Sequence, residues 1–316
     1  MNDSYDAITV RPVDSSIGVN ISIEKAFAAY ENGTPIPEIA EHFADAVEKG
    51  FRESPQVDLE SLSDYEQMKS KLSMEVVSAE KNAELLESVP HERMEDMAVV
   101  YRFVLDQTDS GNGTILVTNQ LLDQYGITKE QLRADAMENA PAIRPSEIRG
   151  MSEVMSELAP GMIPEVAPED EQMFVATVPD KIHGAGVIAY PNFMEDAAQK
   201  MGGDFFVLPS SIHEVLLVKD NGQMTAKELE NMVKEVNATQ VEPADQLTDH
   251  VYHYDSQNHI FELADKYEER QREADVVADK DSVLGDLKEK KQEIAKKNPA
   301  KDAATKAETK KHEASL

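Results

Sequence analysis

Cysteine is absent from the 316 residues of this sequence, and so is tryptophan. Without cysteine the chain cannot form a disulfide, a thiol nucleophile, an iron–sulfur cluster or a cysteine-ligated zinc site. The absence suits a reducing cytoplasm, which is where we expect the protein to reside. Because aromatic residues make up only 6% of the chain, the core must be built mainly from Leu, Val, Ile, Met and Ala.

Long apolar runs are also missing. No stretch approaches the roughly 20 residues that a helix needs to span a bilayer. The N-terminus, MNDSYDAITV, lacks a basic region followed by an apolar core, so we expect neither a signal peptide nor a membrane partner. The length allows one large domain or two smaller ones.

Positive charge is scarce: Lys and Arg number 31 against 61 Asp and Glu, a net charge of −30. Residues 281–316 hold 9 Lys and 7 acids, which leaves 22 basic and 54 acidic residues in the rest of the chain. The strong negative charge of residues 1–280 repels nucleic-acid phosphates and anionic lipid surfaces. We therefore expect no direct nucleic-acid binding. The charge is typical of a solvated acidic surface, and it can also steer basic partners or mimic DNA to occupy a nucleic-acid-binding protein.

Apolar alternation and helical periodicity predict an α+β fold in which hairpin–helix units repeat on a mostly antiparallel sheet. Prolines interrupt the chain between residues 144 and 172 and favour a boundary there. We therefore expect an N-terminal lobe (1–143), a helix with an acidic Pro-rich connector (144–172), a C-terminal lobe (173–265), and a charged helix with a disordered Lys-rich tail (266–316).

Some segments predict particular elements. Hairpins are expected for ITVRPV with VNISI, MAVVYRFVL with TILVT, MFVATV with GVIAYP, and DHVYHYD with HIFELA. Helices are expected over SEIRGMSEVMSEL and TAKELENMVKEVNA, the second with a capping box formed by Thr225 and Glu228. GNGTILVTNQLLD (111–123) matches GAGVIAYPNFMED (184–196) at positions that include Gly111, Gly113, Ile115 and Asp123, which raises the hypothesis of a duplicated hairpin–helix unit.

The densest polar signal is PSSIHE, which lies between the apolar runs FFVL and EVLLV. Its Ser210, Ser211, His213 and Glu214 are the candidate ligand contacts. A Ser–His pair can act as nucleophile and base when an acid orients the imidazole. Neighbours on a strand point to opposite faces, so Glu214 is poorly placed to orient His213, and no Gly-x-Ser-x-Gly elbow surrounds either serine. We interpret the segment as a chain reversal, with a hydrolase using Ser210 or Ser211 and His213 as the alternative.

The histidines of DHVYHYDSQNH, at 250, 253 and 259, invite a metal-site interpretation. The segment is β-like, and residues three apart on a strand face opposite sides, so we expect no metal site. The two Gly-x-Gly units lack the third glycine of a dinucleotide fingerprint and lie in predicted hairpins. We therefore expect no cofactor and no catalytic residue.

Several segments together resemble a bacterial family of unknown function that occurs in gut anaerobes and near mobile genetic elements. They are VPHERMEDMAVVYR, ITKEQLRADAMENAP, GDFFVLPSSIHEVLLV, MVKEVNATQV and DHVYHYD, spread over roughly residues 20 to 265. The resemblance implies a soluble cytoplasmic protein and carries no catalytic residues.

The leading expectation is a non-enzymatic protein-interaction or regulatory factor of a bacterial host or mobile element. Its protein partner and its oligomeric state are not specified by the sequence. The alternatives are an acidic DNA mimic and a hydrolase built on His213.

Overall fold

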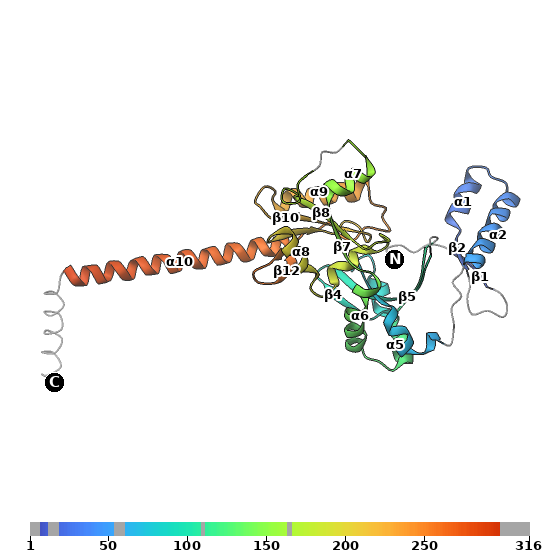
Figure 1. The fold of residues 1–316 in the computed structure, drawn as a ribbon, viewed down its shortest axis with the longest axis horizontal. Helices are drawn as coiled ribbons and strands as arrows, with labels where there is room; N and C mark the ends of the chain where they lie inside the picture. The colour runs from blue at the N-terminus through green and yellow to red at the C-terminus, as the bar shows by residue number, and fades with distance from the viewer. Residues whose placement is uncertain (1–6, 12–18, 54–60, 109–110, 163–165, 298–316) are drawn as a thin grey trace, which may run out of the picture. The chain divides into compact units, whose positions relative to one another are not determined.

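The computed structural model describes residues 7–11, 19–53, 61–108, 111–162 and 166–297. The chain divides into two compact units, residues 1–264 and 265–316. Helices and strands are mixed, and every strand pair in the described part of the chain is antiparallel (Figure 1). The predicted α+β class is confirmed.

The first described elements form a small hairpin followed by two helices. They are β1 (Ala7–Val10), β2 (Val19–Ser22), α1 (Glu24–Glu31) and α2 (Ile36–Glu53). β1 and β2 pair from Ala7 opposite Ser22 to Val10 opposite Val19, which confirms the first predicted hairpin. We call residues 7–11 and 19–53 the N-terminal module.

A four-stranded sheet and its helices follow. Their elements are η1 (Ser61–Ser63), α3 (Tyr65–Met68), η2 (Lys69–Lys71), β3 (Leu72–Ser78), α4 (Ala83–Ser88), β4 (His91–Met94), β5 (Met97–Thr108), β6 (Gly111–Leu116), α5 (Asn119–Tyr125) and α6 (Lys129–Ile143). β5 is the central strand: β3 pairs along one side, and β4 and then β6 pair along the other. The β5–β6 pair confirms the second predicted hairpin.

The remaining strands of the first unit form a six-stranded sheet in the order β12-β11-β9-β10-β8-β7. Its elements are β7 (Glu147–Gly150), α7 (Met151–Leu158), β8 (Met173–Thr177), η3 (Gly184–Ala189), α8 (Phe193–Met201), β9 (Phe205–Leu208), β10 (Val215–Lys219), α9 (Ala226–Thr239), β11 (Tyr252–Asp255) and β12 (Ile260–Leu263). The pairing of β11 with β12 confirms the last predicted hairpin.

The hairpin expected between MFVATV and GVIAYP is wrong. GVIAYP begins as the 3-10 helix η3, and β8 pairs with β7 and β10 instead. Two glycines explain the close packing of η3: a Cβ on Gly184 would lie 2.1 Å from Thr177 Oγ1, and a Cβ on Gly186 would lie 2.3 Å from the Met74 carbonyl oxygen. Residues 111–116 are a strand, so the two segments matched in the duplication hypothesis differ in conformation over their first residues, although a helix follows each.

The helix expected over SEIRGMSEVMSEL starts later than predicted. Its first residues form the edge strand β7, with Glu147 opposite Thr177 of β8, and the helix α7 begins only at Met151. Pairing with β8 supplies backbone hydrogen-bond partners for EIRG, so this segment is a strand rather than a further helical turn.

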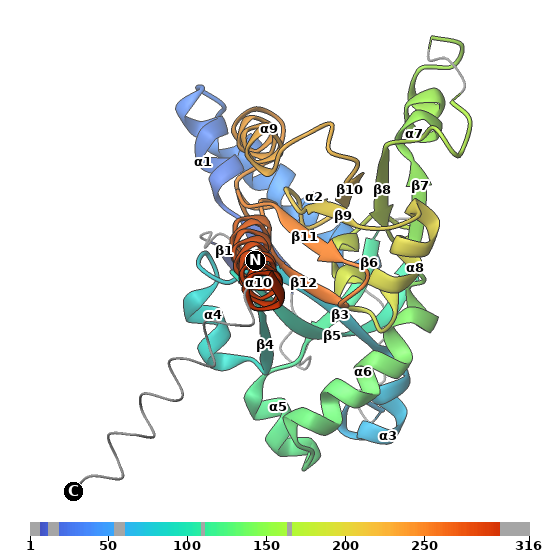
Figure 2. The same cartoon turned by 90° about the vertical axis from the view of Figure 1, so that its left-hand side faces the viewer.

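One apolar core joins the two sheets. It contains side chains from β3, β5 and α6 together with side chains from β8, β9, β10 and β11, among them Leu72, Met74, Tyr101, Phe103, Leu132, Phe174, Val207, Leu217 and Tyr252. A second cluster lies on the other face of the six-stranded sheet, where Leu229 and Val233 of α9 pack with Phe206 and Leu208. Figure 2 shows α9 and α6 on opposite sides of this part of the molecule. Because both faces of β9 are buried, its sequence FFVL is apolar throughout.

The helix expected after residue 265 is present as α10 (Ala264–Lys297), which is 34 residues long. The Lys-rich tail that we expected to be disordered begins after Pro299 and lies outside the described residues. In the part of the chain that the structure describes, α10 and the other helices are all too short or too polar to cross a membrane.

Candidate functional site

The PSSIHE segment forms the connection between β9 and β10, as predicted. These strands pair antiparallel, with Leu208 opposite Leu216. A later segment fixes the connection in place: Ile212 N–H donates to the Asp245 carbonyl at 2.8 Å, and Leu247 N–H donates to the Ser210 carbonyl at 3.1 Å. The reversal is thus a strand connection that is itself held by backbone hydrogen bonds.

The four candidate contacts lie together on a pocket of about 530 Å³. Ser210, Ser211, His213 and Glu214 line it, and the residues that complete it are Lys181, Leu216, Val236, Gln240, Val241, Glu242 and Asp245. Three carboxylates and one lysine therefore face the same space, so the pocket is polar and predominantly acidic. A group with hydrogen-bond donors fits this lining better than an anion does.

The ring of His213 is held at both nitrogens. The backbone N–H of His183 donates to Nδ1 at 3.2 Å, and Nε2 lies 3.5 Å from Asp245 Oδ2. Since Nδ1 accepts a hydrogen bond, the proton of the neutral ring is on Nε2, facing the carboxylate. The hydroxyl oxygen of Ser211 accepts from the backbone N–H of His213 at 3.0 Å.

This arrangement differs from a serine-hydrolase triad. In a triad one ring nitrogen binds the orienting acid and the other accepts the proton of the serine hydroxyl. Here the nitrogen that could accept a proton, Nδ1, is occupied by a backbone N–H, and the other faces Asp245. Among the hydrogen bonds of the described residues, none joins the imidazole of His213 to Ser210 or Ser211. The pocket therefore presents polar contacts without an assembled nucleophile and base.

Behind the pocket, His183 connects this region to the four-stranded sheet. Its Nδ1 lies 2.8 Å from Oε1 of Glu75 on β3, and Arg102 Nε of β5 donates to Oε2 of the same carboxylate at 2.7 Å. The Glu75 side chain is only 3% exposed. Burial opposes ionisation of this carboxyl, but hydrogen bonds and charges from His183 and Arg102 outweigh it and hold the pKa of Glu75 below its usual value.

The loop between β8 and η3 carries both Lys181 and His183, and both residues have left-handed backbone angles, with φ of 56° and 52°. That conformation is uncommon for residues other than glycine. Arg144 Nη2 donates to Oδ1 of Asp180 at 2.7 Å and holds the loop from the end of α6. The loop thus brings Lys181 to the pocket while it brings His183 to Glu75.

Sequence reasoning found the pocket residues of the β9–β10 connection but missed Asp245, Lys181 and Glu75. Asp245 and Lys181 lie about 30 residues away in the chain, and only the tertiary fold brings them near His213. Glu75 had a local signal that could have been used, because it is a charged residue inside the otherwise apolar or small strand LSMEVVS.

The three clustered histidines of the last hairpin do not converge. Each pairs with a carboxylate from a different part of the chain: His250 Nδ1 with Asp96 Oδ2 (2.9 Å), His253 Nε2 with Asp220 Oδ2 (3.0 Å), and His259 Nδ1 with Glu195 Oε1 (3.4 Å). Over the described ranges, no three His, Asp or Glu side chains are grouped so that they could hold a metal ion. These histidines thus tie the hairpin to its neighbours.

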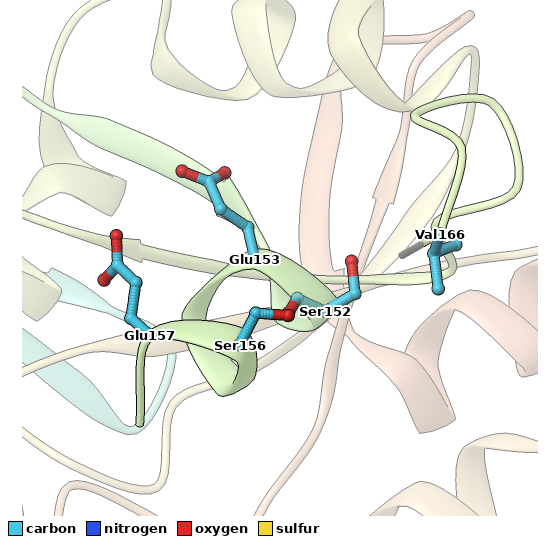
Figure 3. A pocket seen from close by; sticks show the side chains of 5 residues that line it. All are labelled: Ser152, Glu153, Ser156, Glu157 and Val166. Atoms are coloured by element: carbon cyan, nitrogen blue, oxygen red, sulfur yellow. The ribbon is translucent and has the colours of Figure 1, made fainter. Parts of the chain in front are cut away.

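A second polar pocket, of about 420 Å³, lies along α7. Figure 3 shows Ser152, Glu153, Ser156 and Glu157 projecting from this helix, with Val166 on the side of Ser152 and away from Glu157. Arg149 pairs with both glutamates, since it donates to Glu153 Oε1 at 3.0 Å and also contacts Glu157 Oε1. Internal pairing therefore already satisfies the acids of this pocket.

A third pocket, of about 430 Å³, is of a different kind. It lies in the N-terminal module and is lined by Ile21, Ser22, Ala26, Ala29, Ile39, His42, Phe43 and Ala46. Six of these eight residues are apolar, and they come from β2, α1 and α2. We call this pocket the N-terminal groove.

The N-terminal module exposes its apolar side chains. Among residues 7–52, every residue whose burial is described is exposed or partly exposed. Phe27 is 61% exposed, Tyr30 55% and Ile36 65%. In the sheets of the same unit, by contrast, large apolar side chains are almost fully buried.

The fold and these pockets define an α+β protein with antiparallel sheets, an acidic polar pocket and an apolar groove in the N-terminal module. The chain belongs to the family of unknown function DUF5688, which matches residues 1–256. The expected membership of a family of unknown function is thereby confirmed. No curated protein and no solved structure matches the chain.

Proposed function

We propose that this protein is a non-enzymatic protein-interaction factor that binds its partner through the N-terminal module. The observation that carries the proposal is the apolar N-terminal groove together with exposed Phe27, Tyr30 and Ile36. Large apolar side chains that stay exposed are characteristic of interaction sites, because leaving them in water forfeits the free energy of their burial.

The geometry around His213 supports the non-enzymatic part of the proposal. Its ring nitrogens are engaged by the His183 backbone and by Asp245, so neither is directed at a serine hydroxyl. The hydrolase alternative would require this ring to rotate and exchange both partners. The DNA-mimic alternative depends on rows of acids at the spacing of duplex phosphates and stays a prediction.

We further propose that the protein works in the cytoplasm of a bacterial host or as part of a mobile element. The cysteine-free sequence and the resemblance to a family of gut anaerobes support this setting. A regulatory role would follow if the bound partner is itself an enzyme or a nucleic-acid-binding protein.

A paired capture experiment tests the interaction. The tagged full-length chain is expressed in its native host, either unchanged or as Phe27→Ser/Tyr30→Ser. The control is Leu158→Ser/Met162→Ser, which removes two side chains that are 76% and 81% exposed near α7. All four positions are exposed, so the substitutions should leave the fold intact.

We expect a partner to be enriched by the unchanged chain and by the control but not by the Phe27/Tyr30 variant. Equal recovery by all three chains would contradict binding through the N-terminal module. Recovery of no partner by any chain would contradict the proposed function itself.

A further inference from the structure

We propose that the N-terminal groove accepts a basic amphipathic helix of another protein. The inference rests on the proposed function and specifies the chemistry of the partner. It is carried by the lining of the groove, by the charge of the helices that form it, and by the unfavourable charge of the main alternative, a second copy of this chain.

The lining suits a helix. Two helices and a strand form the groove, and its lining combines the small side chains of Ala26, Ala29 and Ala46 with the larger ones of Ile39 and Phe43. An amphipathic helix binds such grooves by inserting apolar side chains spaced three or four residues apart. The exposed Phe27, Tyr30 and Ile36 belong to the same two helices.

The charge favours a basic partner. Residues 24–53 contain seven acids and three basic residues, and Arg52 already pairs with Glu48 at 2.9 Å. Lys and Arg flanking the apolar face of an incoming helix would therefore meet a surface of opposite sign, which accelerates association and orients the helix. The long stems of these side chains can also cover apolar surface at the rim.

The same charge disfavours a second copy as the occupant. Two modules packed face to face would bring together two acidic helix pairs, each on a chain of net charge −30. Such like charges repel one another as the copies approach. The experiment below also tests whether the chain dimerises through this groove.

The binding test uses the full chain and a designed 18-residue Leu/Lys peptide, labelled with a fluorophore and measured by anisotropy. A peptide of the same composition in scrambled order keeps the charge but loses the apolar face. A Leu/Glu peptide keeps the apolar face but reverses the charge. The scrambled peptide is essential because a chain this acidic attracts any cation.

Two neighbouring alanines provide a matched pair of variants. Ala29 lines the groove, whereas Ala28 is exposed on the same helix and does not line it. Ala29→Met should fill the groove, and Ala28→Met adds the same side chain outside it. Alanine and methionine are both good helix formers, so α1 should persist in each variant. Circular dichroism and the melting temperature verify that both variants fold.

We expect the Leu/Lys peptide to bind, and Ala29→Met to weaken it by roughly tenfold or more while Ala28→Met changes it by less than about twofold. The scrambled and Leu/Glu peptides should bind at least about tenfold more weakly than the Leu/Lys peptide. Equal effects of the two substitutions, or equal binding of the scrambled peptide, would overturn the inference.

The oligomeric state is measured in parallel by light scattering. A dimer that Ala29→Met dissociates and Ala28→Met does not would assign the groove to a second copy and would also overturn the inference. Failure of the peptide test leaves the proposed function standing if host capture still depends on Phe27 and Tyr30, so the two failures are distinguishable.

Discussion

Replacing Arg102 with methionine removes the permanent positive charge beside buried Glu75. The Glu75 side chain is 3% exposed, and Arg102 Nε donates to its carboxylate at 2.7 Å. Removing one partner of a buried ion pair costs about 3–5 kcal/mol, because the remaining charge is left without compensation. His183 still contacts the other carboxylate oxygen, so we expect a loss near the lower end, about 3 kcal/mol. For a chain of this size the melting temperature should fall by roughly 5 °C.

The assay is denaturant-induced unfolding at neutral pH, followed by circular dichroism, for the unchanged chain, Arg102→Met and Glu75→Met/Arg102→Met. The double variant removes both charges and leaves two apolar side chains, so it should be more stable than Arg102→Met alone. A loss below about 1 kcal/mol in the single variant would show that Glu75 does not depend on Arg102. A double variant less stable than the single one would equally refute the reasoning.

The pH dependence of the same pair gives a second check. Burial opposes ionisation of Glu75, but His183 and Arg102 outweigh it, so its folded-state pKa lies below the ordinary 4.5. The carboxylate therefore contributes stability above its unfolded-state pKa, and that contribution is lost as the pH falls through the folded-state pKa. In Arg102→Met the ionised Glu75 contributes less stability, so less is lost when it is protonated. The free energies of unfolding of the unchanged chain and of Arg102→Met should therefore converge as the pH falls. A gap that widens as the pH falls would contradict this sign.

Three further substitutions test the packing. Gly186→Ala should destabilise the chain by about 1–3 kcal/mol in thermal unfolding, because its Cβ would lie 2.3 Å from the Met74 carbonyl oxygen; an unchanged melting temperature would mean that η3 packs differently. Thr225→Ala should cost about 1 kcal/mol in denaturant unfolding through loss of the capping box of α9, and no loss would contradict that cap. Tyr252→Phe should cost about 1.5–3 kcal/mol, because the buried hydroxyl donates to the carboxylate of Asp96; an equally stable variant would exclude that hydrogen bond from the folded state.

The elements predicted correctly are those whose signals are local. Thr225 and Glu228 are three residues apart, and their capping box forms as the sequence indicates. The apolar run FFVL predicts a buried strand, and in the structure both faces of that strand are covered. The polar segment PSSIHE predicts a chain reversal, and it connects the paired strands β9 and β10. Such patterns depend on a few consecutive residues and survive in almost any tertiary context.

The elements predicted incorrectly are decided by distant neighbours. GVIAYP has the composition of a strand, yet η3 forms there because Gly184 and Gly186 pack closely against β8 and β3. EIRG continues a helical pattern in the sequence, but β8 offers it a pairing edge. Neither partner can be recognised from the residues of the segment itself, because propensity yields to tertiary pairing.

The candidate site shows the same division. The sequence places Ser210, Ser211, His213 and Glu214 together because they are nearly consecutive, and all four line one pocket. The groups that determine their chemistry come from elsewhere: Asp245 faces the ring of His213, and the His183 backbone occupies its other nitrogen. Whether the imidazole can serve as a base is therefore a property of the fold.

The most direct test of the central claim is site-specific photocrosslinking in the native host. A photoreactive phenylalanine analogue is placed at Phe27, which is 61% exposed on α1 of the N-terminal module, and in a control at Asn231, which is exposed on α9. We predict a discrete crosslinked protein adduct from position 27 and none from position 231. Adducts from position 231 alone, or from neither position, would contradict binding of a partner through the N-terminal module.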